Sequence, residues 1–197
     1  MKKEKESATQ RRLKRAALEC IASQGFEGAS VNEIVVKAGV SKPVLYYYYR
    51  NKEDIYLAIL ADSLADFGQR LEKVAGEDLP PMEKLVTAVK YCFAYIEDSP
   101  EKGFLILDYW ARSGYRPMHE ETAGGFERIR LLIEAIIREG IKAGDYRPGD
   151  PIRYARHLLG MIHSQIMFIY RFPDSAPYAN VEEFVDLFLR GLRSDPA

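Results

Sequence analysis

The sequence has little cysteine and no long hydrophobic stretch. Its two cysteines among 197 residues, Cys20 and Cys92, lie far apart in helical patterns, so they indicate neither a disulfide framework nor a metal site. The most apolar stretch, Met161 to Tyr170, contains polar residues and is half as long as the ~20 residues that span a bilayer. The charged N-terminus is followed by no apolar segment and does not resemble a signal peptide. We therefore expect a cytoplasmic protein with no membrane partner.

Motifs of the common enzyme classes are also missing. The chain has no glycine-rich phosphate loop, no GxSxG nucleophile elbow and no HExxH metal site. Its three histidines lack metal-ligand spacing, since His157 and His163 are six residues apart and fall on different faces of a helix. We expect no catalytic activity, no metal and no cofactor.

Charge is balanced over the whole chain but uneven along it. The net charge is −1, yet residues 1–52 carry eleven basic and five acidic side chains, while the other 145 residues carry 17 basic and 24 acidic ones. A basic N-terminal part on an acidic body indicates contact with a polyanion, although a solvated basic helix start would carry the same charge.

Apolar residues repeat at helical spacing along nearly the whole chain, and almost no segment alternates with the period of a strand. The sequence predicts an all-α protein of about nine helices. After a helix that opens at Ser41, a long one follows directly, and the C-terminal helix is strongly amphipathic. The long helix spans residues 52–75, and the remaining expected helices lie at residues 10–24, 31–37, 82–96, 101–112, 126–137 and 152–171.

Capping residues mark several of these helix starts. Ser30, with Glu33 three residues later, forms a capping box, and Asn51 and Asp150 are expected N-caps. Pro43 follows Ser41 within the first turn, where a missing N–H costs little.

Three short helices and a long one, beginning within about 50 residues, describe a helix-turn-helix head. Gly39 lies in the turn between the second and third helices, where glycine tolerates a positive φ. The run from Val44 to Tyr49 has strand propensity, but the caps on both sides favour a helix. Basic and hydroxyl groups on its outward face suit phosphate contact and major-groove reading.

These residues resemble the TetR/AcrR (tetracycline-repressor-like) family of transcriptional regulators. The matching residues are Ala16-Ala17, Gly25-Phe26, Ser30-Val31-x-x-Ile34, Ala38-Gly39-Val40-Ser41-Lys42, Leu45-Tyr46 and Asn51-Lys52-Glu53-Asp54. Two positions depart from the family pattern. Val35 replaces a usual alanine and Tyr49 a usual phenylalanine, and we interpret both as core residues.

The resemblance implies a helix-turn-helix DNA-binding domain over residues 1–52 and a larger helical effector-binding and dimerisation domain over residues 53–197. It also implies that Tyr46 and Lys52 bind phosphates and that the start of the recognition helix meets base edges. Pro43 and Val44 are apolar, which suits thymine methyl groups. The predicted DNA-binding residues are Ser30, Asn32, Ser41, Lys42, Pro43, Val44, Tyr46, Tyr47, Tyr48 and Lys52.

A helix-turn-helix monomer reads only a half-site, so we expect a symmetric dimer. The last two helices are its expected interface. Two helices from each subunit would form a four-helix bundle, as the resemblance also implies. The alternative is that both helices pack only within their own chain. The predicted interface residues are Leu159, Ile166, Phe184 and Phe188.

The middle of the chain is rich in bulky aromatics, which suit either a ligand pocket or a core. The predicted ligand-binding residues are Tyr91, Tyr95, Phe104, Trp110, His163 and Gln165. We expect Asp108 and Arg112 to be solvated. The composition favours an apolar or aromatic effector.

The sequence therefore predicts a cytoplasmic homodimeric regulator of transcription, most simply a repressor that a small ligand releases from a palindromic operator. The alternative is a DNA-binding protein of the same fold that has no small-molecule pocket and answers to a protein partner. A helical protein that has lost DNA binding is a further alternative, and the retained Lys42, Tyr46 and Lys52 speak against it.

Overall fold

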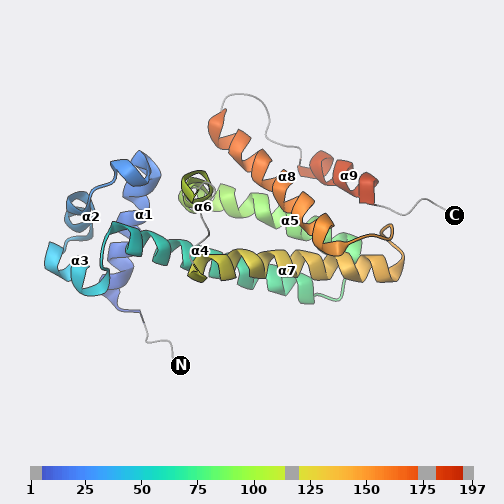
Figure 1. The fold of residues 1–197 in the computed structure, drawn as a ribbon, viewed down its shortest axis with the longest axis horizontal. Coiled ribbons are helices and arrows are strands. Elements are labelled where there is room, and N and C mark those ends of the chain that lie inside the picture. Colours follow the sequence, from blue (N-terminus) through green and yellow to red (C-terminus); the bar gives the residue numbers. More distant parts are fainter. Residues whose placement is uncertain (1–5, 114–119, 173–180, 193–197) are drawn as a thin grey trace. The chain divides into compact units, whose positions relative to one another are not determined.

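The computed structural model describes residues 6–113, 120–172 and 181–192 (Figure 1). The elements within them are all α-helices, which confirms the predicted fold class. They are α1 (Ala8–Gly28), α2 (Val31–Ala38), α3 (Lys42–Tyr48), α4 (Lys52–Gly76), α5 (Pro81–Asp98), α6 (Pro100–Ser113), α7 (Glu120–Ala143), α8 (Pro151–Arg171) and α9 (Val181–Leu192).

The helices form two compact units that are discontinuous in sequence. The head unit comprises residues 1–64 and 99–122, and the body unit comprises residues 65–98 and 123–197. The head unit thus contains α1 to α3, the first half of α4, and α6, which packs against α1. The sequence analysis did not anticipate this grouping of α6, and its functional division after residue 52 stays a prediction.

Local capping explains how the head unit begins. The Ser7 hydroxyl accepts a hydrogen bond from the Gln10 N–H at 3.1 Å, and the Gln10 side chain accepts one from the Ser7 N–H at 2.9 Å. This capping box starts α1 at Ala8, two residues before the predicted start. Gly25, at φ +73°, kinks the helix where the sequence placed its end, and one more turn follows to Gly28.

The helix-turn-helix forms as predicted. Ser30 and Glu33 complete the capping box of α2, and Gly39 ends that helix in the left-handed region at φ +64°. Ile34 and Leu45 are fully buried between the helices. The aromatic run is helical to Tyr48, and Tyr49 is extended and buried, which confirms it as a core residue.

The body unit is an α-helical core in which α5 packs against α8 and α9. Phe93 of α5 meets Phe184 of α9 edge to face, with ring centroids 5.6 Å apart. The ammonium of the buried Lys84 forms an ion pair with Glu139 at 3.0 Å. The described residues include no helix long and apolar enough to cross a membrane.

A close glycine–tyrosine contact closes the turn after α7. The Tyr146 hydroxyl donates to the Pro81 carbonyl at 2.9 Å, and its ring lies directly over Gly140. A Cβ at position 140 would stand 2.2 Å from the ring, so only glycine admits the tyrosine there. Gly144, at φ +84°, turns the chain between them.

Candidate nucleic-acid interface

The recognition helix α3 presents a basic and aromatic surface. Lys42 and Pro43 are exposed, and the side chains of Tyr46 and Tyr47 are 52% and 81% exposed. Val44 is half-buried. Groups of this kind can reach phosphates and base edges in a groove.

Tyr48 has a structural contact that the sequence analysis left open. It is half-buried, its hydroxyl accepts a hydrogen bond from the Ser7 hydroxyl at 3.3 Å, and its ring meets Tyr47 edge to face at 4.9 Å. Tyr48 therefore ties α3 to the start of α1, and its contact with DNA stays a prediction.

The serines that precede α2 and α3 differ in their hydrogen bonds. The Ser30 hydroxyl donates to the Glu33 carboxylate at 2.8 Å and accepts from the Glu33 N–H at 3.2 Å. These bonds hold the pKa of Glu33 below its usual value, chiefly through the Ser30 hydroxyl. The exposed Ser41 makes no such capping bond, and Asn32 is exposed beside Glu33.

Most basic side chains of the head unit already contact acceptors. Lys14 pairs with Glu6 and Asp62, and Arg15 and Lys37 both pair with Glu19. Arg11 donates to the Glu6 carbonyl, and Arg50 lies 3.8 Å from Asp54. These internal partners compete with any phosphate.

Two cations differ from the others. Within residues 6–113, neither Arg12 nor Lys42 has an ion pair or a hydrogen bond to its side chain, and both are exposed. A guanidinium nitrogen of Arg12 lies 3.9 Å from the position that a Cβ would take on Gly39, so it reaches the turn between α2 and α3. Arg12 is absent from the predicted set, and only folding brings it to that turn.

Lys52 caps the end of α1. Its ammonium donates to the carbonyl oxygens of Phe26 at 2.6 Å, Ala29 at 2.8 Å and Glu27 at 3.3 Å. Cations at a helix C-terminus stabilise its unpaired carbonyl groups. The phosphate contact predicted for Lys52 stays a prediction, and it would require the ammonium to leave these carbonyls.

The Phe26 ring is a junction of three helices in the head unit. The Arg112 guanidinium of α6 lies 3.5 Å from its centroid, and the Lys52 ammonium of α4 lies 4.4 Å from it. The Tyr56 ring meets it edge to face at 5.0 Å. Phe26, itself on α1, is buried, so these contacts form part of the packed interior.

Asp108 anchors the same junction. It accepts a hydrogen bond from the Tyr56 hydroxyl at 3.0 Å, and Arg112 lies 3.8 Å from it and 3.9 Å from Glu27. Burial raises the pKa of Asp108, an effect that the Tyr56 bond and the Arg112 charge oppose. The side chain of Asp108 is 13% exposed, so the expectation that it is solvated was wrong, whereas Arg112 is exposed as expected.

The predicted ligand-binding residues occupy several environments. Tyr91 and Tyr95 of α5 contact Phe67, with centroids 5.2 and 5.1 Å away. Phe104 is half-buried and Trp110 exposed on α6, while His163 and Gln165 are half-buried on α8, where burial lowers the pKa of His163. Their role in ligand binding stays a prediction.

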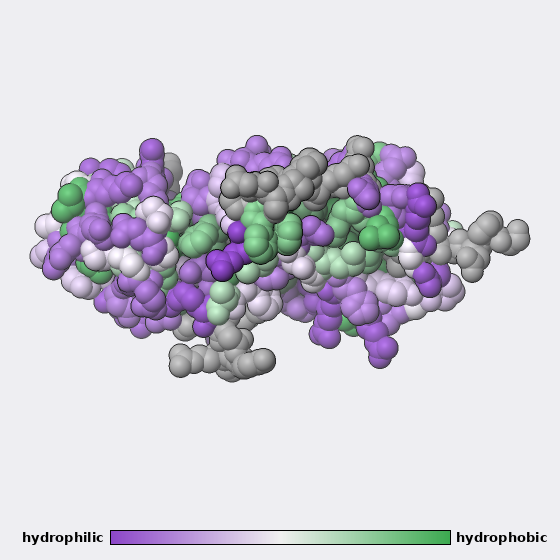
Figure 2. Space-filling view, turned by 90° about the horizontal axis from the view of Figure 1, so that it is seen from above, coloured by the Kyte–Doolittle hydropathy of each residue, from purple (hydrophilic) through white to green (hydrophobic). Residues whose placement is uncertain are grey.

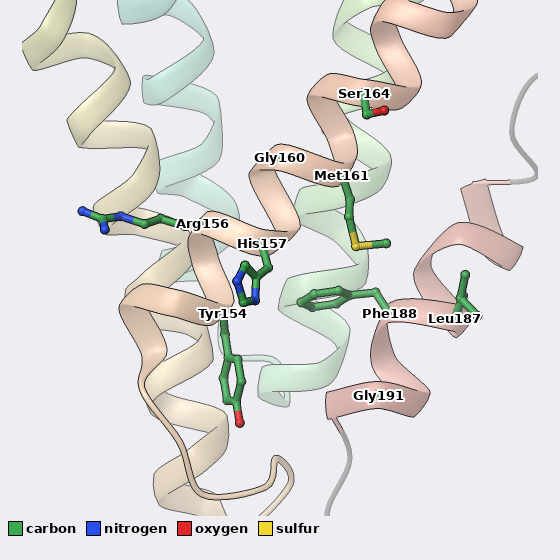
Figure 3. Close-up of a pocket in the computed structure, with 9 residues that line it drawn as sticks. All are labelled: Tyr154, Arg156, His157, Gly160, Met161, Ser164, Leu187, Phe188 and Gly191. Carbon is green, nitrogen blue, oxygen red and sulfur yellow. The ribbon is translucent and has the colours of Figure 1, made fainter.

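An open groove of about 690 Å³ lies between α8 and α9 (Figure 3). His157 and Met161 of α8 reach toward Phe188 of α9. None of the predicted ligand-binding residues lines it. The lining residues are Tyr154, Arg156, His157, Gly160, Met161, Ser164, Leu187, Phe188 and Gly191.

Apolar side chains are exposed on the same two helices. Of the predicted interface residues, Ile166 and Phe184 are buried within the chain, Leu159 is half-buried, and Phe188 lies at the groove. Figure 2 shows hydrophobic surface among polar areas on this part of the body unit. Large apolar side chains that the sequence analysis did not select are exposed there: Met167, Phe168, Phe172 and Leu187.

Comparison with known proteins supports the interpretation of the N-terminal helices as a DNA-binding helix-turn-helix. A family model described as bacterial regulatory proteins, tetR family, matches residues 13–59. The fatty acid metabolism regulator protein of Bacillus subtilis is 25% identical over 144 residues, which cover 73% of this chain and 74% of the relative.

Two solved structures have the same fold. The transcriptional regulator FadR from Bacillus subtilis, in complex with stearoyl-CoA, has a TM-score of 0.80 at 20% identity and covers 92% of this chain and 98% of its own. A putative transcriptional regulator from Saccharomonospora viridis, in complex with choline, has a TM-score of 0.85 at 20% identity, with 96% and 100% covered. At such identity the likeness shows the fold alone.

Proposed function

Because the chain belongs to the TetR family of bacterial regulatory proteins, which regulate transcription by binding DNA and are not enzymes, we propose that it is a homodimeric repressor controlled by an apolar ligand. The observation that carries the proposal is the exposed face of α3, held beyond a left-handed turn at Gly39. DNA binding follows from the family, and the repressor role, the operator symmetry and the ligand class are our proposals.

The free cations divide into two roles at the DNA. Lys42, at the start of α3, would donate to guanine O6 or N7 in the major groove, while Pro43 and half-buried Val44 would meet thymine methyl groups. Arg12, on α1 beside the turn, would bind a phosphate and fix the register of the head on the duplex. Tyr46 and Tyr47 would add hydroxyl contacts with the backbone.

The groove between α8 and α9 supports a dimer of this chain. Leu187 and Phe168 are 67% and 50% exposed, which is unfavourable for large apolar side chains in water. A second copy related by a two-fold axis would cover both helices and form a four-helix bundle. Such a dimer carries two reading heads, so its operator would be palindromic.

The effector we propose is a molecule with a long acyl chain. The body unit is rich in apolar and aromatic side chains. One relative is a fatty acid metabolism regulator protein of Bacillus subtilis, and one structural neighbour, FadR from Bacillus subtilis, is in complex with stearoyl-CoA. The structural neighbour with choline supplies the competing class, a small cation.

Capture of genomic fragments by the purified protein, followed by sequencing, tests the proposal. We expect a palindromic site, and release from it on addition of stearoyl-CoA but not choline. Release by choline alone would overturn the ligand class, and release by neither would favour control by a protein partner. Capture of no fragment by the folded dimer would contradict the regulator itself, and Lys42→Met serves as the variant with lowered sequence discrimination.

A further inference from the structure

We propose that Val36 of α2 contacts the C5 methyl group of a thymine and thereby helps to determine which operator sequence the protein prefers. The inference rests on the proposed function, because the thymine belongs to the operator that the same helix-turn-helix binds. Val36 is absent from the predicted DNA-binding residues, and it is 79% exposed. Its position on α2, the charges around it and its lack of polar side-chain atoms together indicate this contact.

The exposed residues of α2 form two rows of side chains that are four positions apart: Glu33 with Lys37, and Asn32 with Val36. The first row lies beside α1. The Lys37 ammonium pairs with Glu19 at 2.9 Å, and the Gln24 side chain approaches the Glu33 carboxylate at 3.5 Å. The row of Asn32 and Val36 is therefore turned away from α1, so α1 does not cover it.

This second row ends at the turn that leads into α3. The Gly39 N–H donates to the Val36 carbonyl at 3.1 Å, and α3 begins shortly afterwards at Lys42. Arg12 reaches the turn from α1, with a guanidinium nitrogen 3.9 Å from the Cβ position of Gly39. Val36 thus lies next to a turn that two exposed cations flank, and neither cation has an ion pair or a side-chain hydrogen bond within residues 6–113.

This location places Val36 at the edge of the major groove. In a helix-turn-helix the first helix crosses the DNA backbone and the second enters the groove. Val36 is in the last turn of α2, at the end joined to α3, whereas Ser30 caps the opposite end. When Arg12 binds a phosphate and Lys42 a base, as proposed above, Val36 is brought against the same stretch of duplex.

The chemistry of Val36 selects one partner there. A valine side chain has no hydrogen-bond donor or acceptor, so it gains nothing from the polar edges of guanine, cytosine or adenine. The thymine C5 methyl is the apolar group that base edges present in the major groove. Contact between the two removes apolar surface of both from water, which is favourable. Thymine is therefore the preferred base opposite Val36.

Replacement of thymine by deoxyuridine isolates this contact, because it removes only the C5 methyl group. The captured operator fragment is resynthesised with one thymine at a time replaced in each half-site. Its affinity is then measured for the parent protein, Val36→Thr and Val44→Thr. Threonine keeps the size of valine and exchanges one methyl group for a hydroxyl. Val44→Thr is the matched control, since Val44 of α3 is proposed to meet a different thymine.

We expect one thymine whose replacement weakens binding of the parent about fourfold for each half-site, the effect of one buried methyl group. The same replacement should have no effect on Val36→Thr and should keep its effect on Val44→Thr. A second thymine should show the reverse pattern. Val36→Thr should melt with the parent, because its side chain is exposed, and should leave the dependence of log K on log salt unchanged.

Three results would overturn the inference and leave the proposed function intact. An effect of every thymine replacement that persists in Val36→Thr assigns those methyl groups to other residues. A uniform loss of affinity in Val36→Thr, coupled to no thymine, assigns Val36 to the deoxyribose backbone. Unchanged DNA binding by Val36→Thr leaves its row of α2 to a protein partner. Capture of no fragment by the folded parent is a separate failure, since it contradicts the proposed function and the inference with it.

Discussion

Replacing Lys52 with methionine removes its ammonium and keeps a side chain of similar length against Phe26. The ammonium donates to three carbonyl oxygens at the end of α1, at distances of 2.6, 2.8 and 3.3 Å. A hydrogen bond to a charged group contributes about 1.5–3 kcal/mol. The three bonds share one half-exposed group, so we count them together and expect a loss of about 2 kcal/mol in the free energy of unfolding.

Thermal unfolding followed by far-UV circular dichroism measures this loss. For a chain of this size, 2 kcal/mol corresponds to a decrease in Tm of about 4–8 °C. All variants are compared at one protein concentration, because the Tm of a dimer depends on it. Lys42→Met is the matched control. Lys42 is exposed and unpaired within residues 6–113, so its replacement should change stability by less than about 0.5 kcal/mol.

The same variant separates the cap from the phosphate contact. Loss of a phosphate contact would flatten the dependence of log K on log salt by about 0.9 and leave Tm unchanged. Loss of the cap lowers Tm with little change in this slope. If Lys52→Met melts with the parent protein and the slope flattens, the ammonium binds DNA and the reasoning from the α1 carbonyls is wrong.

Three other perturbations test particular contacts. Gly140→Ala places a Cβ 2.2 Å from the Tyr146 ring and should lower the free energy of unfolding, measured in urea, by about 1–3 kcal/mol. Its control, Gly124→Ala, has open space around the new Cβ and should raise the free energy of unfolding by about 0.5–1 kcal/mol. Equal effects of the two variants would contradict the packing argument. Glu33 has a pKa below its usual 4.5, so the stability it contributes is present above that value and disappears as pH falls through the lowered pKa. Glu33→Gln should therefore be less stable than the parent at pH 7, and the difference should shrink as pH falls below 4.5; a difference that stays constant with pH would refute the linkage. Arg12→Gln should weaken binding to all DNA sequences alike and flatten the salt slope by about 0.9; an unchanged slope would remove Arg12 from the interface.

The features that the sequence predicted are local ones. The capping box at Ser30, the N-caps Asn51 and Asp150 and the turn at Gly39 each depend on residues within a few positions of one another, and the structure confirms all four. The Ser7–Gln10 box has the same spacing and could have been predicted by the same rule.

The features that the sequence missed depend on tertiary packing. Lys52 contacts carbonyls 23 to 26 positions earlier in the chain, and Arg112 contacts a ring on α1. Helical periodicity shows that α6 has an apolar face but not which helix covers it, so Asp108 was expected in solvent. Every residue has a backbone carbonyl group, so residue types do not indicate which carbonyl groups accept hydrogen bonds from Lys52. The sequence therefore predicted an ammonium that was free to bind phosphate.

The discontinuous head unit has a consequence for building hybrid regulators. The helix-turn-helix motif is contiguous and invites a cut at residue 52, but such a cut separates Phe26 from Tyr56 and Arg112. In such a hybrid the Phe26 ring would lose these partners and would pack against the α6 of another protein. A hybrid regulator should therefore take the helix-turn-helix motif together with α6 from the same protein. Two heads that match in sequence up to residue 52 are interchangeable only when positions 56, 108 and 112 match as well.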